Sequence, residues 1–486
     1  MARTSRLFRK GELIEVDIRD IAFGGKGIGK IPTDQGDFTV FVLNTIPGQR
    51  VRARVVKCKN KYAECKLDEV LHPSQEEVSI PYQRIPGAPY ASLPIEVQHN
   101  MKERTTLELY RRIGGVEDVD SVYKGLLPSP ENWHYRNKME YAFSVIRYDL
   151  DEEEMHDDFG LGFKHRGTWW AVENLDRDSG LFDPHVENHL KDIRQWCENT
   201  GLPSWHPPKR EGFFRYLVAR KSYYSGELLF NLVTTSSDLD RFDLGAFIDM
   251  MKSLFGECLA GIIHTINDDK GDRVEPRDGD ATLVYGKDKI VEMINGLKFE
   301  ISMYSFFQTN PKSAERLYDA AIACIGDKIG SDDVVLDLFC GTGTISQLIS
   351  RTYDCRVVGV DIIASAINDA RANAQRNGID DISFYAEDAG KFLYNHPEYR
   401  GKIKALVLDP PRAGIAPKTL RKVMALESNR IVYISCNPAT QARDTEVLRE
   451  GGYRLTHLQL CDQFPHTSHI EAIAVYDRIH GNSGAV

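Results

Sequence analysis

Hydrophobic and polar positions follow two different periods along the chain, and the change comes near residue 307. Before that point most apolar residues alternate with polar ones, which is the period of a β-strand with one exposed face. After it, short apolar runs alternate with stretches in which apolar residues recur every three or four positions, as in amphipathic helices. The pattern therefore predicts β-rich N-terminal and central parts followed by an α/β C-terminal part.

The first domain is predicted at residues 1–71. Its alternating stretches lie at 13–23, 38–46, 49–58 and 62–71. Between the first two stretches, GGKGIGK (24–30) is interpreted as a turn rich in glycine and lysine. Four or five short strands in about sixty residues indicate a small OB-like β-barrel. The basic side chains of RVRARVVKCKNK (50–61) would lie along one face, so we expect this barrel to bind RNA through its phosphates.

The second domain is predicted at residues 72–300 and is expected to bind the RNA substrate. It begins with a connector rich in proline and polar residues (72–100) and a helix over 101–116 that ends at two glycines. Strand-like stretches dominate from residue 135 onwards. The acidic run at 149–158 is interpreted as a solvated loop between two of these strands.

The third domain is predicted at residues 301–486. Buried strands are expected at 333–339, 356–362, 382–388, 404–411 and 430–438, with helical stretches between most of them. This rhythm predicts a doubly wound, mainly parallel sheet. In such folds, ligands bind beyond the carboxyl ends of the strands.

Composition and charge narrow the function classes. The 486 residues suffice for three domains, and no apolar run reaches the ~18 residues of a membrane span. Nine scattered cysteines suit a reducing compartment, so we expect a cytoplasmic protein. We also expect a monomer. The net charge of −10 hides a local excess, because residues 1–67 hold 14 Lys and Arg against 7 Asp and Glu. That basic front favours a nucleic-acid partner.

A cofactor site is predicted around VVLDLFCGTGTISQLI (334–349), which reads as a strand, a glycine turn and a helix. Ser346 replaces the third glycine of the dinucleotide pattern, which argues against a pyrophosphate ligand. Asp361, 24 residues after Asp337, can accept hydrogen bonds from both ribose hydroxyls, and Asp388 can contact an adenine amino group. Acidic residues on successive strand ends are typical of S-adenosylmethionine-dependent methyltransferases. The alternative is an αβ sandwich in which these aspartates are only surface residues at strand ends.

The candidate nucleophile is Cys436, in SCNP at the end of a strand. In amino-group methyltransferases an aromatic residue follows the Pro-Pro pair, whereas Arg412 follows it here, after Asp409. Carbon 5 of a pyrimidine becomes nucleophilic enough to attack a methyl sulfonium when a thiolate has added to carbon 6. A free thiol has a pKa near ~8.5, so the site must favour the anion. The alternative for Cys436 is a small buried hydrophobic residue.

The candidate base is Glu471, at the start of the last predicted strand. Once carbon 5 is methylated, its proton must leave before the thiol can be eliminated, and this step needs a base. Cys461, His466, His469 and Glu471 could also be drawn as a metal group, but their spacing matches no zinc pattern. We therefore predict no metal.

Together these segments resemble the RNA 5-methyluridine methyltransferases, especially the branch acting on 23S ribosomal RNA. The resemblance runs over nearly the whole chain, including a TRAM-type barrel, FFQTNP, LDLFCGTGT, DPPRAG, SCNP and FPHTSHIEAI. It implies that Cys436 is the nucleophile, Glu471 the proton acceptor and S-adenosyl-L-methionine the cofactor. The implied cofactor contacts are Gln308, Phe339, Gly341, Thr344, Asp361, Asp388 and Asp409. Thr344 stands where some relatives have asparagine, and Asp361 where many have glutamate.

One departure from the family concerns iron. Many relatives hold a four-iron four-sulfur cluster through a C-x5-C-x2-C run after the barrel. The matching positions here are Ile80, Pro86 and Pro89, and no cysteine occurs between Cys65 and Cys197. Without thiolates we expect no cluster.

The leading hypothesis is therefore methylation of carbon 5 of a uridine in 23S ribosomal RNA. The nearest alternative is the T-loop uridine of transfer RNA. An RNA-binding assembly factor that has lost catalysis, and a cytosine-5 methyltransferase, are further alternatives.

Overall fold

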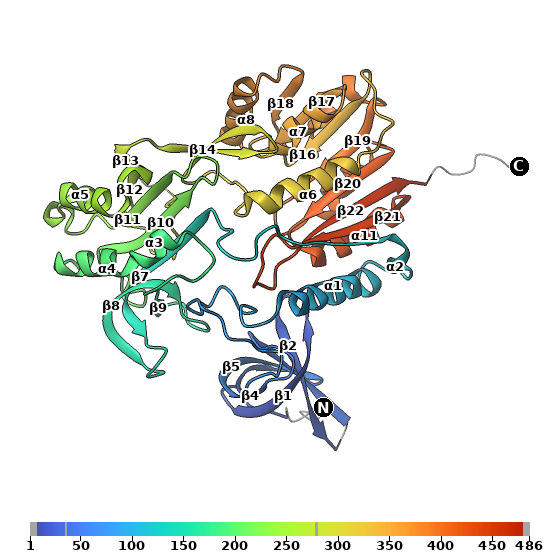
Figure 1. The fold of residues 1–486 in the computed structure, drawn as a ribbon. Coiled ribbons are helices and arrows are strands. Elements are labelled where there is room, and N and C mark those ends of the chain that lie inside the picture. The colour runs from blue at the N-terminus through green and yellow to red at the C-terminus, as the bar shows by residue number, and fades with distance from the viewer. Residues whose placement is uncertain (1–6, 35, 278–279, 480–486) are drawn as a thin grey trace, which may run out of the picture.

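The computed structural model describes residues 7–34, 36–277 and 280–479. It contains a β-barrel, a central β-rich region and a C-terminal α/β region, which surround a common centre (Figure 1). The predicted fold class is confirmed. Within the described part of the chain, no helix is both long and apolar enough to cross a membrane.

The barrel is closed by five strands in the order β1-β2-β3-β5-β4. They are β1 (Leu13–Ala22), β2 (Lys26–Thr33), β3 (Gly36–Leu43), β4 (Arg50–Cys58) and β5 (Tyr62–His72). The prediction of a turn at 24–30 was wrong from Lys26 onwards, where β2 begins. Gly27 and Gly29 are needed for packing inside this strand, because a Cβ atom there would collide with Thr45 and Val16.

The central sheet has seven strands in the order β13-β12-β11-β10-β7-β8-β9. They are β7 (Lys138–Tyr148), β8 (Met155–Lys164), β9 (Val172–Asn174), β10 (Phe214–Lys221), β11 (Leu228–Thr234), β12 (Leu259–Ile266) and β13 (Ala281–Gly286). One face packs on α3 (Pro184–Asn188), α4 (Leu190–Asn199) and α5 (Leu244–Phe255). The acidic run was only partly predicted correctly, since its last four residues, 155–158, belong to β8.

The opposite face of the central sheet packs on the C-terminal region. Val218, Leu229 and Ile263 of this sheet share a hydrophobic core with Val335 and Ile434 of the C-terminal sheet. A two-stranded sheet of β14 (Lys289–Ile294) and β15 (Leu297–Ser302) contributes to the same core. The central and C-terminal regions are therefore joined by buried apolar side chains, which hold them in a fixed relation.

The C-terminal sheet has eight strands in the order β18-β17-β16-β19-β20-β22-β21-β6. The strands are β16 (Val334–Leu338), β17 (Arg356–Asp361), β18 (Ile382–Ala386), β19 (Ile403–Leu408), β20 (Arg430–Ser435), β21 (Tyr453–Cys461), β22 (Glu471–Arg478) and β6 (Tyr123–Leu127). β22 runs antiparallel to β20 and β21, while β16 to β20 are parallel. The edge strand β6 comes from far earlier in the chain and pairs with β21.

Helices cover both faces of this sheet (Figure 1). They include α1 (Ile95–Arg112), α2 (Val119–Val122), α6 (Pro311–Ala323), α7 (Thr344–Thr352), α8 (Ala364–Arg376), α9 (Phe392–Asn395), α10 (Pro417–Met424) and α11 (Pro438–Glu450). α1 begins six residues before the predicted start at 101, within the predicted connector. It packs against α11, so it belongs to the helical layer that supports the end of β20.

Candidate active site

The glycine turn after β16 leaves the chain backbone accessible. Phe339, Gly341 and Gly343 all have positive φ angles, of 67°, 52° and 76°. A Cβ atom at Gly343 would meet the ring of Phe384 at 2.7 Å, whereas the space beside Gly341 is open. A ligand can therefore approach the backbone at Gly341 closely, just before α7 begins at Thr344.

Asp361 ends β17, and two backbone amides fix its carboxylate. Gly341 N–H donates to Oδ2 at 3.0 Å and Ile363 N–H donates to Oδ1 at 2.9 Å. Each oxygen keeps a lone pair that can accept a hydroxyl. Ile362 and Ile363 are 71% and 56% exposed, which is unusual for apolar residues and provides a surface for a flat ring. The sequence analysis did not identify this pair, although it directly follows the strand-end acid.

Asp388 lies two residues beyond β18 instead of ending that strand as predicted. Its carbonyl oxygen accepts hydrogen bonds from the N–H groups of Lys391 and Phe392, at 2.8 and 3.1 Å. Asp388 therefore opens the turn that leads to α9. Its side chain is partly exposed and available to a ligand.

Gln308 comes from the segment between β15 and α6. Its carbonyl oxygen accepts from Asn137 Nδ2 at 3.0 Å, and its Oε1 accepts from Gln463 Nε2 at 3.4 Å. These two contacts place Gln308 between the central region and the loop that precedes β22. Phe306, two residues earlier, is 74% exposed.

Carboxyl groups with raised pKa values gather at the carboxyl ends of the central strands. Asp337 at the end of β16 is fully buried, and burial raises its pKa to about 7. Its Oδ2 accepts from Ser346 Oγ, while Oδ1 has no hydrogen-bond partner among the described residues. Burial likewise raises the pKa of Asp409, after β19, to about 7. Charge on Asp409 and Asp361 raises the pKa of Asp337 further, so these groups interact.

Cys436 and Glu471 face each other across two antiparallel strands. In the register of β20 and β22, Ser435 pairs with Ala472, so the next residue along each strand places Cys436 opposite Glu471. Cys436 is partly exposed and Glu471 is 3% exposed. Burial raises the pKa of the Cys436 thiol to about 11, and the charges of Glu471 and Asp409 add to this effect. Burial raises the pKa of Glu471 to about 8.

Arg412 is the cation that acts on both groups. Its charge lowers the pKa of Cys436 and of Glu471, against the effect of burial. The Arg412 carbonyl accepts from Asn437 Nδ2 at 3.0 Å, which ties the Asp-Pro-Pro-Arg loop to the residue that follows the cysteine. Asp444 of α11 strengthens this link, because its Oδ2 accepts from Ile415 N–H and from Tyr433 Oη.

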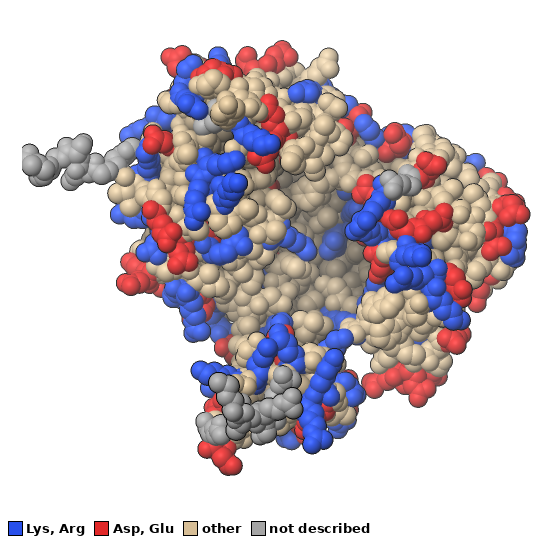
Figure 2. Space-filling view, turned by 180° about the vertical axis from the view of Figure 1, so that it is seen from behind, with Lys and Arg blue, Asp and Glu red and all other residues tan. Residues whose placement is uncertain are grey.

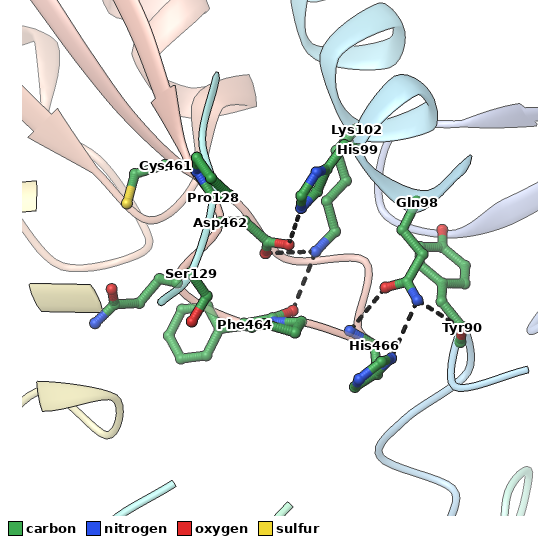
Figure 3. A network of polar contacts seen from close by, with 12 residues as sticks. Tyr90, Gln98, His99, Lys102, Pro128, Ser129, Cys461, Asp462, Phe464 and His466 are labelled. Atoms are coloured by element: carbon green, nitrogen blue, oxygen red, sulfur yellow. Dashed lines mark hydrogen bonds and ion pairs between the residues drawn. The ribbon is translucent and has the colours of Figure 1, made fainter. Parts of the chain in front are cut away.

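A buried polar network holds the loop before Glu471 (Figure 3). Lys102 Nζ donates to Asp462 Oδ1 at 2.7 Å and to the Phe464 carbonyl at 3.1 Å. Gln98 Oε1 accepts from His466 N–H at 2.8 Å, and Gln98 Nε2 donates to the Tyr90 carbonyl at 3.0 Å. Helix α1 and the connector thus fix the chain that leads into β22. Sequence analysis missed this role, although a buried lysine and glutamine four residues apart break the apolar face of the helix.

The four residues considered as a metal group do not bring three ligand atoms together, although Cys461 and Glu471 are paired across β21 and β22. Cys461 Sγ lies 3.6 Å from Ser313 Oγ, and the ring of His466 stacks on Trp133 at 3.6 Å between centroids. Among the described residues, three potential ligand atoms come together only at Asp149, Glu152 and His156.

Comparison with known proteins agrees with this architecture. The family described as tRNA (Uracil-5-)-methyltransferase matches residues 277–479, and the TRAM domain matches residues 8–67. An uncharacterized RNA methyltransferase of Clostridium acetobutylicum is 36% identical over 480 residues, covering 97% of this chain and 99% of the relative. A similarly named protein of Caldanaerobacter subterraneus is 34% identical over 473 residues, covering 96% and 99%.

The chain belongs to the RNA uracil-C5 methyltransferase family.

A solved structure shares the fold of this uracil-C5 methyltransferase. The Pyrococcus abyssi tRNA (uracil-54, C5)-methyltransferase, in complex with S-adenosyl-L-homocysteine, has a TM-score of 0.69 and 24% identity. The match covers 95% of this chain and all of that one. The protein is an RNA (uracil-C5)-methyltransferase that uses S-adenosyl-L-methionine and binds RNA as its substrate.

Proposed function

We propose that the enzyme methylates carbon 5 of a uridine in 23S ribosomal RNA through a covalent adduct between Cys436 and carbon 6. The observation that carries the chemistry is the cross-strand placement of Cys436 beside Glu471, on the side of the sheet where the glycine turn is open. The choice of ribosomal RNA rests on the resemblance of the whole chain to that branch.

The proposed reaction has four steps. The Cys436 thiolate adds to carbon 6 of uracil, and the electron pair of the C5–C6 double bond moves into an enolate. Carbon 5 would then attack the electrophilic methyl group that S-adenosylmethionine supplies, so that the C5–CH3 bond forms as the methyl–sulfur bond breaks and S-adenosylhomocysteine is left. Glu471 removes the proton from carbon 5, and the pair left behind re-forms the C5–C6 bond as the thiolate leaves. The enzyme ends with a free cysteine and a protonated Glu471, which returns its proton to solvent.

The raised pKa of Cys436 implies that its thiol is protonated in the free enzyme. With a pKa of about 11, Cys436 is almost entirely protonated at neutral pH. The thiol proton therefore passes to solvent when the target uracil binds, with Arg412 stabilising the developing thiolate, and the thiolate takes a proton back from solvent after product release. A pKa of about 8 makes the Glu471 carboxylate a stronger base than an exposed glutamate, and at pH 7 about a tenth of Glu471 is ionised in the free enzyme.

Residues of the strand ends would hold the cofactor. The open backbone at Gly341, with Phe339 and Thr344 on either side of it in the chain, fits the amino acid part, and Asp361 fits the ribose hydroxyls. Asp388 would contact the adenine. Gln308 and Asp409 would lie near the methyl group, between the cofactor and Cys436.

RNA would occupy the space between the three regions. Figure 2 shows a hollow in this position, with Lys and Arg side chains along its rim and on the barrel below it. The barrel (1–71) and the central region (72–300) would bind RNA around the catalytic region (301–486). Arg3 and Arg6 of the basic front lie outside the described residues. A monomer acting in the cytoplasm completes the proposal.

The enzyme is further proposed to lack an iron–sulfur cluster. In place of thiolates, the connector is held by Arg166, whose Nε and Nη2 donate to the Pro86 carbonyl at 2.9 and 2.6 Å, and by the buried side chain of Ile85. Purified enzyme should contain less than ~0.1 iron per chain by elemental analysis, because a cluster needs cysteine ligands. Stoichiometric iron would contradict this proposal.

The covalent chemistry is tested with RNA that contains 5-fluorouridine. Fluorine at carbon 5 cannot leave as a proton, so the methylated adduct should persist and run as a protein–RNA band on a denaturing gel. Release of methylated RNA without an adduct would contradict the mechanism. A protein that had lost catalysis would give neither adduct nor methyl transfer.

The RNA class is tested by mapping 5-methyluridine in cells with and without the gene. Loss of the nucleotide from 23S ribosomal RNA supports the proposal. Loss from the transfer RNA T-loop would favour the alternative proposal, methylation of the T-loop uridine. That alternative is considered because the chain shares its fold with a tRNA (uracil-54, C5)-methyltransferase.

A further inference from the structure

A pocket of about 640 Å³ lies on the central sheet, outside the strand ends described above. Its lining includes Lys164 of β8, Tyr216 of β10 and Tyr304, together with Asp272 from the loop after β12. The volume is within the range of sites that hold small organic groups. It is therefore large enough for a nucleotide.

The pocket opens on the sheet face that meets the catalytic region. Tyr216 precedes Val218 by two residues in β10, so both side chains lie on one face, and Val218 belongs to the core shared with the C-terminal sheet. Tyr304 stands four residues before Gln308, which is at most ~14 Å of extended chain. One RNA strand can therefore reach both the pocket and the catalytic strand ends.

The walls of the pocket are held rigidly. Tyr304 Oη accepts from Asn231 Nδ2 at 2.7 Å and lies 2.7 Å from Thr265 Oγ1. Buried Arg215 donates to the carbonyls of Asn267, Asp269 and Gly271, at 2.5 to 2.8 Å. Arg215 therefore fixes the loop backbone up to Gly271, the residue that precedes Asp272.

Asp272 already places an anion in the pocket. Its carboxylate is hydrogen-bonded by both Lys164 Nζ and Tyr216 Oη. Lys164 is two-thirds buried as a side chain, and burial together with Arg215 lowers the pKa of its amine to about 8. An ammonium group removed from water in this way needs an anionic partner. A phosphate oxygen offers the same partner chemistry as the Asp272 carboxylate.

We propose that this pocket binds one nucleotide of the RNA substrate other than the target uridine, with its phosphate on Lys164 and Tyr216, and that Asp272 occupies the phosphate position until RNA displaces it. The tyrosine rings provide apolar surface for the base. The Glu140 carboxylate in the lining can accept a hydrogen bond from an exocyclic amino group, as on cytosine. The proposal rests on RNA being the substrate, and it is independent of the chemistry at Cys436.

The test measures binding of a labelled 16-nucleotide RNA of mixed sequence by fluorescence anisotropy at several salt concentrations. Lys164→Met should weaken binding roughly tenfold, since one charge-assisted hydrogen bond is lost. It should also lower the slope of log Kd against log salt by about 0.7, the value for one phosphate of a single strand. Asp272→Asn should have the opposite effect and tighten binding, because the competing carboxylate is gone.

Combining the two changes separates this proposal from a folding defect. In the Lys164→Met background, Asp272→Asn should tighten binding by less than it does in the unmodified protein, because the two residues act on one position and only Tyr216 remains to hold the phosphate. The matched controls are Lys191→Met on α4 and Asp249→Asn on α5, both exposed on helices that cover the other face of the sheet. They should leave Kd and the salt slope unchanged.

Two results would overturn the proposal. One is an unchanged salt slope in Lys164→Met. The other is unchanged or weaker binding in Asp272→Asn. Failure of the proposed chemistry would show differently, as methyl transfer by Cys436→Ala, whatever the binding results.

Discussion

The carboxyl ends of the C-terminal strands and the β4 face of the barrel place their charged groups in opposite environments. At the strand ends, Asp337, Asp409 and Glu471 are acidic groups whose pKa values are raised to about 7 or 8 by burial. On β4, Arg50 and Arg54 are exposed and Arg52 is half-buried, and each forms an ion pair with a carboxylate of the barrel. Burying ionisable groups costs folding stability, whereas exposed ion pairs contribute little to it.

This difference modifies the expectation for the barrel. The basic residues of β4 do lie on one face, but Glu15, Glu69 and Asp68 neutralise them. A run of arginines in a sequence therefore overstates the positive charge that an RNA would meet. Partners on neighbouring strands decide the charge that remains.

The sharpest test of the comparison is Cys436→Ala. Methyl transfer should fall by at least ~10⁴-fold, because the nucleophile is removed, while S-adenosylmethionine still binds. Transfer of tritiated methyl groups and calorimetry of cofactor binding measure the two effects. Cys258→Ala, an exposed cysteine, is the matched control and should be fully active. Full turnover by Cys436→Ala would show that this thiol is not the nucleophile.

The next largest effect is expected for Glu471→Gln. Proton removal from carbon 5 should slow by about 10²–10⁴-fold, so that methylated RNA stays attached to Cys436. A denaturing gel of the reaction with unmodified RNA shows the adduct as a slowly migrating band. If the variant releases product without any adduct, another group is the base.

Stability should depend on pH through the same carboxyl group. The pKa of Glu471 rises from 4.5 to about 8 on folding. Between these values the unfolded chain has lost the proton that the folded chain keeps, so the free energy of unfolding falls as pH rises. Glu471→Gln should therefore lose less stability between pH 5 and pH 9, by roughly 1–4 kcal/mol. Thermal unfolding at the two pH values measures this, and equal pH dependence in both proteins would contradict it.

The smallest effect is expected on β4. Glu69→Gln removes an exposed partner of Arg52 and should change stability by less than about 1 kcal/mol. RNA binding should tighten by about threefold at low salt, since one more cation becomes available, and this gain should vanish at high salt. A loss of several kcal/mol would mean that the barrel depends on its ion pairs.

Local signals explain what the sequence could predict. Asp361, Cys436 and Glu471 lie at or next to strand ends, as expected, because each follows or opens an apolar run that can only be a strand. The helical stretches predicted between the strands of the third domain are also present, among them α7 and α8.

Contacts between distant segments explain the rest. Lys102 and Gln98 are unremarkable in a helix until Asp462 and His466, more than 350 residues later, fold onto them. The prediction of a turn at β2 relied on the usual preference of glycine for turns. In the structure, Gly27 and Gly29 instead leave room for neighbouring side chains. The helices α4 and α5 were not predicted, although the sequence carries a local signal for α5, where the side chain of Asp243 caps the helix by accepting from the Ala246 N–H.

The edge strand β6 has a consequence for how the protein is made. Residues 123–127 leave the ribosome long before residue 461, yet they pair with β21. Until synthesis is nearly complete this segment has no partner, and a fragment starting at residue 301 would expose the edge of β21 to other chains. The last large sheet to be translated is completed by a strand translated much earlier, so the segment around residue 123 must remain available until the C-terminal sheet forms.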